Sequence, residues 1–260
     1  MGPVAQPPTQ LPTLECTVLG TYPHDCSAFC QGLHYERETK TLLESTGMYG
    51  ESTCRRVDIS SGRVREQEWL DRRMFGEGLS VHGDTCVQLL WREGLCLLRD
   101  AATLAFREAV PLPRGMREGW GLTSDGAGTF YASDGSSTLH ELDAASLKVK
   151  RTVRVTVDGN ELTYINDLQW VDGLVWANVW RDDRIAAIDP QSGEVRGFVD
   201  LSRLLTPEER NRLNSEEVLN GIAHDPDGDC MYVTGKNWPK LFKIAVPRLP
   251  AHSAEDPAQD

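Results

Sequence analysis

One short motif recurs five times along this chain of 260 residues, and this repetition restricts the possible folds more than any other feature. Each copy places a polar or aromatic residue directly before a glycine or aspartate, followed by an aliphatic residue. The copies are FCQGL (29–33), FGEGL (75–79), EGWGL (118–122), YINDL (164–168) and VLNGI (218–222). A period of about 45 residues indicates one supersecondary unit repeated around an axis. The residue before the glycine or aspartate differs in most copies, which suits a shared active site better than a purely structural signature.

The first four units each contain the signals of four β-strands, and the fifth contains the signals of three. The motif opens the first strand, and a second strand-like run follows, as in LLEST and VWANVW. A third run ends on an aspartate turn, as at Asp58 and Asp189, and the first four units add a fourth run. Alternating, β-branched runs between Gly, Asp and Ser turns are typical of strands, and four strands per unit describe a propeller blade. The sequence therefore predicts an all-β fold, a five-bladed β-propeller with four-stranded blades.

The chain ends complete this prediction. The fifth unit stops at LFKIAV without an outer strand, so we expect the N-terminal run 16–22 to supply that strand and close the ring. Residues 14–246 are then one catalytic propeller domain. The segments 1–13 and 247–260 are Pro-rich or polar and lack the period, and we expect both to be disordered tails.

One insertion departs from the all-β pattern. Between the fourth and fifth units, Thr206 precedes Pro207, and Glu209 follows three positions after the threonine. This is a capping box with proline at the first helical position, and it predicts a short helical insertion near 206–217. Because the connection between neighbouring blades crosses the face where the first strands begin, we expect this helix to lie beside the motif residues.

Charge and composition limit the partners. The net charge of −12 is spread over the chain without a basic stripe, which argues against binding to nucleic acid or to an anionic membrane. No apolar run has the length of a membrane helix, and the N-terminus lacks the features of a signal peptide. We expect a soluble monomer of unknown compartment, cytoplasmic as the sequence stands and periplasmic or secreted if a leader has been removed.

No sequence motif indicates a metal or an organic cofactor, and we expect none. The acidic stretch 225–229 lacks the spacing of a calcium loop, and HExxH is absent. Seven cysteines are an odd number without a CxxC pair, which favours buried free thiols, although Cys86 and Cys96 could pair.

The predicted fold brings the motif residues to one face. If each motif opens an inner strand and the second strand returns antiparallel, the end of the second strand lies beside the start of the first. The expected ring then has two sets of members, the motif residues Gln31, Glu77, Trp120, Asn166 and Asn220 and the second-strand residues Glu44, Trp91, Asp134, Trp180 and Lys236. Acid, base, amide and indole groups together suit general acid–base chemistry on a small polar substrate.

Longer stretches of the chain resemble a known family. YPHDCSAFCQGLHY, LLESTGMYGESTCRRVD, EGWGLTSDG, ANVWRDDRIAAIDPQSGEV and VTGKNWPKLFKI are similar to the plant-type and bacterial glutaminyl-peptide cyclotransferases, which are five-bladed propellers. The similarity covers Thr17 to Val246. It implies conversion of an N-terminal glutamine of peptides or proteins to pyroglutamate with release of ammonia, and it implies no metal.

The resemblance also implies a set of site residues. By matching position the family pocket falls on Phe29, Gln31, Glu77, Trp120, Asn166, Trp180 and Lys236. We expect Glu77 and Lys236 to be catalytic, Glu77 as the group that takes and gives a proton and Lys236 as a stabiliser of the oxyanion, and the other five to bind substrate. Further possible members are Glu44, Asp134, Asn220, Trp91 and His24.

Two other functions are compatible with these residues. A calcium-dependent propeller lactonase or esterase would use acidic and amide ligands on the channel axis, and Glu77, Asn166 and Asn220 could supply them. A non-catalytic peptide-binding propeller would need no pairing of Glu77 with Lys236.

Overall fold

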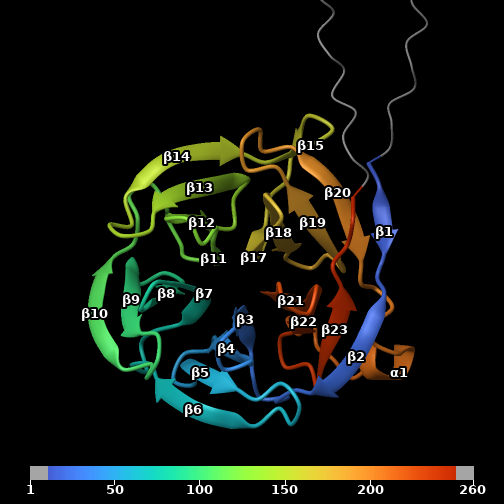
Figure 1. Ribbon diagram of the computed structural model, residues 1–260, viewed down its shortest axis with the longest axis horizontal. Helices are drawn as coiled ribbons and strands as arrows, with labels where there is room; N and C mark the ends of the chain where they lie inside the picture. The colour runs from blue at the N-terminus through green and yellow to red at the C-terminus, as the bar shows by residue number, and fades with distance from the viewer. Residues whose placement is uncertain (1–10, 250–260) are drawn as a thin grey trace, which may run out of the picture.

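Five sheets, antiparallel except for one short edge strand, stand around a central axis (Figure 1), and the predicted five-bladed β-propeller is confirmed. The structure is a computed structural model that describes residues 11–249. Blades 1 to 3 each consist of four strands consecutive in the chain. Their bounds are β3 (Cys30–Glu36), β4 (Thr41–Thr46), β5 (Thr53–Val57) and β6 (Val64–Trp69); β7 (Gly76–His82), β8 (Thr85–Leu90), β9 (Leu95–Asp100) and β10 (Phe106–Pro111); β11 (Leu122–Ser124), β12 (Thr129–Ser133), β13 (Thr138–Asp143) and β14 (Val149–Arg154).

The last two blades include strands from the N-terminus. Blade 4 contains β17 (Ile165–Val171), β18 (Leu174–Val179), β19 (Arg184–Ile188) and β20 (Val195–Asp200), and blade 5 contains β21 (Leu219–Asp225), β22 (Cys230–Gly235) and β23 (Lys240–Ala245). β2 (Val18–Pro23) pairs antiparallel with β23 and is the outer strand of blade 5. The predicted closure of the ring is therefore confirmed, and it leaves the last blade without an open edge at β23.

Two small features were not predicted. β1 (Thr13–Glu15) runs parallel to β20 and adds a fifth strand to blade 4. A hairpin of β15 (Thr156–Val157) and β16 (Asn160–Glu161) lies between blades 3 and 4. All of these pairings involve two or three residues, which is too short for a pattern of alternation to show in the sequence.

The described structure extends beyond the predicted domain bounds of 14 and 246 at both ends. Thr13 belongs to β1, and the carbonyl of Pro12 accepts a hydrogen bond from the amide of Phe198, so the structured part starts before residue 14. At the other end, Arg248 forms ion pairs with Asp172 and Asp229. Packing and charge pairing therefore extend the propeller at both boundaries. The remaining parts of these predictions, 1–10 and 250–260, lie outside the described residues.

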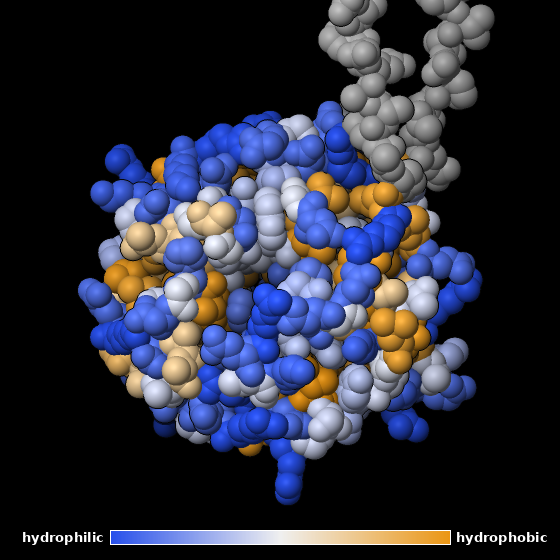
Figure 2. Space-filling model, in the orientation of Figure 1, coloured by the Kyte–Doolittle hydropathy of each residue, from blue (hydrophilic) through white to orange (hydrophobic). Residues whose placement is uncertain are grey.

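Burial of the strands decreases with distance from the central axis. β4, the second strand of blade 1, is buried at all six positions, whereas β6, the outermost, is exposed at five of six. The inner strands are covered on both faces because neighbouring blades pack against each other. Trp176 of blade 4, for example, shares one apolar cluster with Trp238 and Phe242 of blade 5. In Figure 2 the visible face of the ring is largely hydrophilic, and apolar residues gather there in separate small groups.

The glycine of the repeated motif is required by the close approach of adjacent inner strands. A Cβ atom on Gly78 would lie 2.4 Å from the carbonyl oxygen of Trp120, and one on Gly121 would lie 2.0 Å from that of Asn166. The inner strands of blades 1, 2 and 3 thus each pack backbone to backbone on the inner strand of the next blade. This packing fixes the preceding side chain of each motif at the same end of the ring.

The predicted helix is present but short, and its position differs from our expectation. α1 (Pro207–Arg210) begins after Thr206, whose hydroxyl accepts from the amide of Glu209 in the predicted capping box. Figure 1 shows α1 at the outer edge of the ring beside β2. Glu209 also pairs with Lys240 at the start of β23, which holds the helix there. With only four residues, α1 is the longest helix described for residues 11–249, and none there could cross a bilayer.

Candidate active site

A pocket of about 390 Å³ opens at the face where the inner strands begin. All seven residues that the resemblance implies line it, namely Phe29, Gln31, Glu77, Trp120, Asn166, Trp180 and Lys236. Antiparallel pairing explains why they meet. The amide of Trp180, after β18, donates to the carbonyl of Tyr164, before β17, at 2.9 Å. The amide of Lys236, after β22, donates to the carbonyl of Val218, before β21, at 2.9 Å.

Glu77 is a buried carboxyl group without a cationic partner in direct contact. Glu77 is 4% exposed, and its Oε1 accepts a hydrogen bond of 3.0 Å from Nε2 of Gln31. Burial raises the pKa of Glu77 well above its usual range, and the charge of Lys236 opposes this shift only in part. A carboxyl group of this kind can hold a proton at a pH where an ordinary glutamate cannot.

Lys236 is almost as deeply buried and carries an ammonium group that faces the pocket. Within residues 11–249 it forms neither an ion pair nor a side-chain hydrogen bond, and its Nζ lies 4.8 Å from the ring centroid of Phe29. Burial lowers the pKa of Lys236, while the negative charge of Glu77 raises it. The cation–π contact with Phe29 places the ammonium group and leaves its N–H donors open to a ligand.

Two amide side chains extend this arrangement. Nδ2 of Asn220 donates to the carbonyl of Cys30 at 3.0 Å and lies 3.4 Å from Oε1 of Gln31. Asn220 thus orients the carboxamide of Gln31 through its oxygen, and the NH₂ group of Gln31 points to Glu77. Oδ1 of Asn166 is buried and has no hydrogen-bond partner among the described residues, so it can accept one from a ligand in the pocket.

Indole rings form the walls. Trp120 and Trp180 meet edge to face, with ring centroids 6.5 Å apart. Glu118, which we did not predict, fixes two of the indoles, because its Oε2 accepts from Nε1 of Trp91 at 2.8 Å and from Nε1 of Trp120 at 3.0 Å. Glu118 opens the motif EGWGL, and that position was the only available signal. The contact with Trp91 depends on the approach of two blades and is not visible in the sequence.

The five possible members divide into three groups. Trp91 lines the pocket, and Asn220 supports Gln31 without lining it. Glu44 and His24 pair with each other at 2.9 Å between Oε1 and Nε2, and Asp134 lies 3.1 Å from Nε2 of His140. These last three lie outside the pocket and brace the loops around it. His24, for example, holds the carbonyl of Trp238 at 2.6 Å, two residues beyond Lys236.

Other pocket residues were not foreseen. Met48, Phe75, Arg92, Tyr164 and Glu216 also line it. Glu216 comes from the segment after α1, so the insertion reaches the pocket through this residue and not through the helix. The carboxylate of Glu216 pairs with Arg181.

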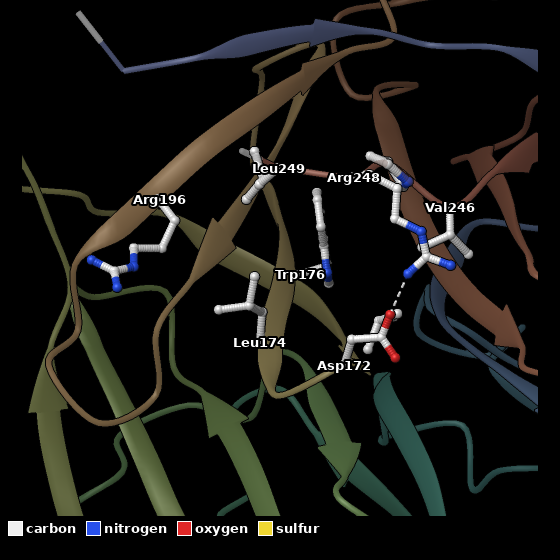
Figure 3. Close-up of a pocket in the computed structure, with 9 residues that line it drawn as sticks. Asp172, Leu174, Trp176, Arg196, Val246, Arg248 and Leu249 are labelled. Atoms are coloured by element: carbon white, nitrogen blue, oxygen red, sulfur yellow. Dashed lines mark hydrogen bonds and ion pairs between the residues drawn. The ribbon is translucent and has the colours of Figure 1, made fainter. Parts of the chain in front are cut away.

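A second cavity of about 360 Å³ lies on the opposite face, at the turn between β17 and β18 (Figure 3). Trp176 and Leu174 line its apolar side, and the carboxylate of Asp172 pairs with Arg248 at its edge. None of the predicted site residues reaches it.

No three His, Cys, Asp or Glu side chains in 11–249 are placed to hold a metal ion, and all seven cysteines are free.

The fold and the pocket together define a propeller enzyme equipped for acid–base chemistry between aromatic walls. The chain belongs to the glutamine cyclotransferase family, whose model matches residues 2–246. It is 40% identical over 239 residues to the glutaminyl-peptide cyclotransferase of Arabidopsis thaliana, covering 92% of this chain and 73% of that relative. The glutaminyl cyclase of Myxococcus xanthus superposes with a TM-score of 0.81 at 31% identity, covering 91% of this chain and 97% of that one. The resemblance seen in the sequence is thereby confirmed.

Proposed function

We propose that this protein is a glutaminyl-peptide cyclotransferase that acts on N-terminal glutamine and that Glu77 and Lys236 carry its chemistry. The family and its named relatives support the activity. The observation that supports the residue roles is one pocket in which a proton-holding carboxyl group, Glu77, and an unpaired ammonium group, Lys236, lie between indoles. The lactonase and the peptide-binding alternatives have no comparable support from the family.

The reaction is an exchange at one carbon atom. The α-amine nitrogen of the substrate bonds to the side-chain carboxamide carbon, and a tetrahedral intermediate forms with negative charge on its oxygen. The bond from that carbon to the amide nitrogen then breaks. A proton lost by the α-amine ends on the departing nitrogen, so the products are the lactam and ammonia, and no water is consumed. The enzyme must therefore move one proton and stabilise one oxyanion.

Glu77 is placed to move the proton. As a carboxylate it accepts the proton from the attacking amine, and as the acid it returns that proton to the leaving nitrogen. The raised pKa suits this shuttle because a stronger base takes the proton more readily. The hydrogen bond from Gln31 fixes the carboxyl group in one orientation.

Lys236 is placed to stabilise the oxyanion. Its ammonium donors are free and lie in a buried site, where a fixed charge acts strongly on a developing negative charge. Asn166 can accept from the carboxamide or amine N–H groups through its unpaired Oδ1. Trp120 and Trp180 restrict the flexible glutamine side chain to folded conformations, which brings the amine to the carbon.

An assay of a short peptide with N-terminal glutamine tests this proposal. Wild-type protein should release ammonia and should lower the mass of the peptide by the mass of one ammonia molecule. Both results should be the same with and without a chelator. The Glu77→Gln variant should lose about 10²- to 10⁴-fold in kcat, the usual contribution of a general acid–base group. Glu68→Gln is the matched control because Glu68 is exposed on the outer strand β6. Full activity of Glu77→Gln would remove this residue from the mechanism, and loss of ammonia release with the chelator would show that a metal is needed.

A further inference from the structure

The mouth of the pocket must accommodate the rest of the substrate chain. On the proposed function, the reacting atoms lie beside Glu77, which is buried at the base of the pocket. Every residue after the glutamine then passes over the rim. We propose that the rim is a binding subsite for the residue directly after the glutamine and that it selects an aromatic or large apolar side chain there. This inference rests on the proposed function.

Exposed apolar side chains gather at the rim. Met48, Tyr49 and Tyr164 are 45%, 50% and 51% exposed. The other large exposed apolar residues, Val18, Leu19, Val64, Trp69 and Phe106, all belong to the outer strands β2, β6 and β10. The three exposed side chains at the rim therefore lie apart from those on the outer surface of the blades. They continue the apolar lining of the pocket outward.

The rim forms two aromatic walls. On one side Tyr49 packs on Phe75, with ring centroids 5.4 Å apart, and on Trp91 at 6.5 Å. On the other side Tyr164 packs on Trp180 at 5.6 Å. Aromatic faces of this kind bind long apolar side chains through burial of their surface, and they bind aromatic side chains with a further gain from ring–ring contact.

The backbone holds these walls in place before a substrate binds. Met48 and Tyr164 have φ values of 86° and 64°, a left-handed conformation that is costly for both residues. Hydrogen bonds maintain it, because the amide of Tyr164 donates to Gly135 at 2.8 Å and the hydroxyl of Ser52 donates to the carbonyl of Met48 at 2.8 Å. A surface that is already ordered loses little entropy on binding.

The two arginines at the rim are each paired with a carboxylate. The guanidinium of Arg92 lies 3.7 Å from the ring centroid of Trp91 and pairs with Glu118 at 2.9 Å. Similarly, Arg181 lies 4.2 Å from that of Trp180 and pairs with Glu216. Each cation is neutralised by a carboxylate, so the walls favour apolar over acidic or basic side chains.

Four substrates test the proposal: glutamine amide, Gln-Gly-amide, Gln-Asp-amide and Gln-Phe-amide. For wild-type protein we expect kcat/KM for Gln-Phe-amide to exceed that for Gln-Gly-amide by about tenfold, mainly through KM. The double variant Tyr49→Ala, Tyr164→Asn should reduce this ratio to about two or less. Asparagine is chosen at position 164 because it tolerates the left-handed backbone. Gln-Asp-amide should behave like Gln-Gly-amide.

The control variant is Phe106→Ala, which removes an aromatic side chain that is 57% exposed on the outer strand β10, and it should keep the wild-type ratio. Equal kcat/KM for Gln-Phe-amide and Gln-Gly-amide in wild type, or an unchanged ratio in the double variant, would overturn the subsite. Absence of ammonia release from all four compounds would instead overturn the proposed function, so the two failures are distinguishable.

Discussion

Two buried glutamates of this propeller show how direct pairing decides what a carboxyl group can do. Glu44 contacts both Arg55 and His24, and although burial opposes the shift, these partners lower its pKa to about 2. Glu77 is buried to a similar extent but has no cation in contact, and burial raises its pKa well above the usual range. Glu44 is therefore a permanent anion that braces the structure, whereas Glu77 can exchange a proton.

The burial of Lys236 predicts a pH dependence of the reaction rate. If Lys236 acts as a cation, kcat should fall as the pH rises through its pKa, and burial places that pKa below the usual value for lysine of about 10.4. The Lys236→Arg variant should be slower but should lose this alkaline decline, because a guanidinium stays charged. The measurement is kcat from pH 6 to 11 with a saturating peptide. The substrate amine titrates on the acid side only, so an alkaline decline that persists in Lys236→Arg would contradict the role of Lys236.

The residues of this site were predictable where one position repeats and unpredictable where blades meet. The alignment of five motif copies indicated that Gln31, Glu77 and Asn166 share a face, because one repeat places each at the same point of its blade. Glu118 could not be found in this way, since its role is to accept hydrogen bonds from the indoles of Trp91 and Trp120, which belong to neighbouring blades. Likewise, the sequence alone did not show that Glu44 is paired and Glu77 is not, because the pairing depends on the register that places Arg55 of β5 opposite Glu44 of β4.

At the scale of the strands, close packing around the axis predicts a strong effect of a small change. Gly121→Ala would place a methyl group 2.0 Å from the carbonyl oxygen of Asn166, and backbone cannot move away as a flexible side chain can. We expect a loss of about 1–3 kcal/mol or more in the free energy of unfolding, together with reduced activity because Trp120 and Asn166 shift. Denaturant unfolding measures the first effect.

Gly20→Ala is the comparison, because the nearest atom to its Cβ is the phenolic oxygen of Tyr22 at 3.3 Å, on a side chain that can adjust. Gly121→Ala and Gly20→Ala with equal stability would show that the inner strands have room to separate.

At the scale of the whole molecule, the ring is closed by a strand far from its partner in the sequence. The absence of a fourth run after LFKIAV made this closure predictable, because a propeller needs its last blade to be complete. The parallel addition of β1 to β20 was not predictable, since blade 4 already had four strands and nothing local demands a fifth.

Ring closure predicts that β2 stabilises the propeller by pairing with β23, whether β2 lies at the start or at the end of the chain. β2 is antiparallel to β23, and the amide of Ala245 donates to the carbonyl of Thr17 at 2.9 Å, so a tight turn can join them directly. A chain that lacks residues 1–23 should lose a large part of the roughly 5–15 kcal/mol of unfolding free energy typical of a domain and should aggregate through the open edge of β23. A permuted chain that starts at His24 and continues from Ala245 through Asn-Gly into residues 17–23 restores the hairpin. It should recover a cooperative thermal transition and ammonia release, and a permuted chain no more stable than the truncated one would contradict this account of how the propeller closes.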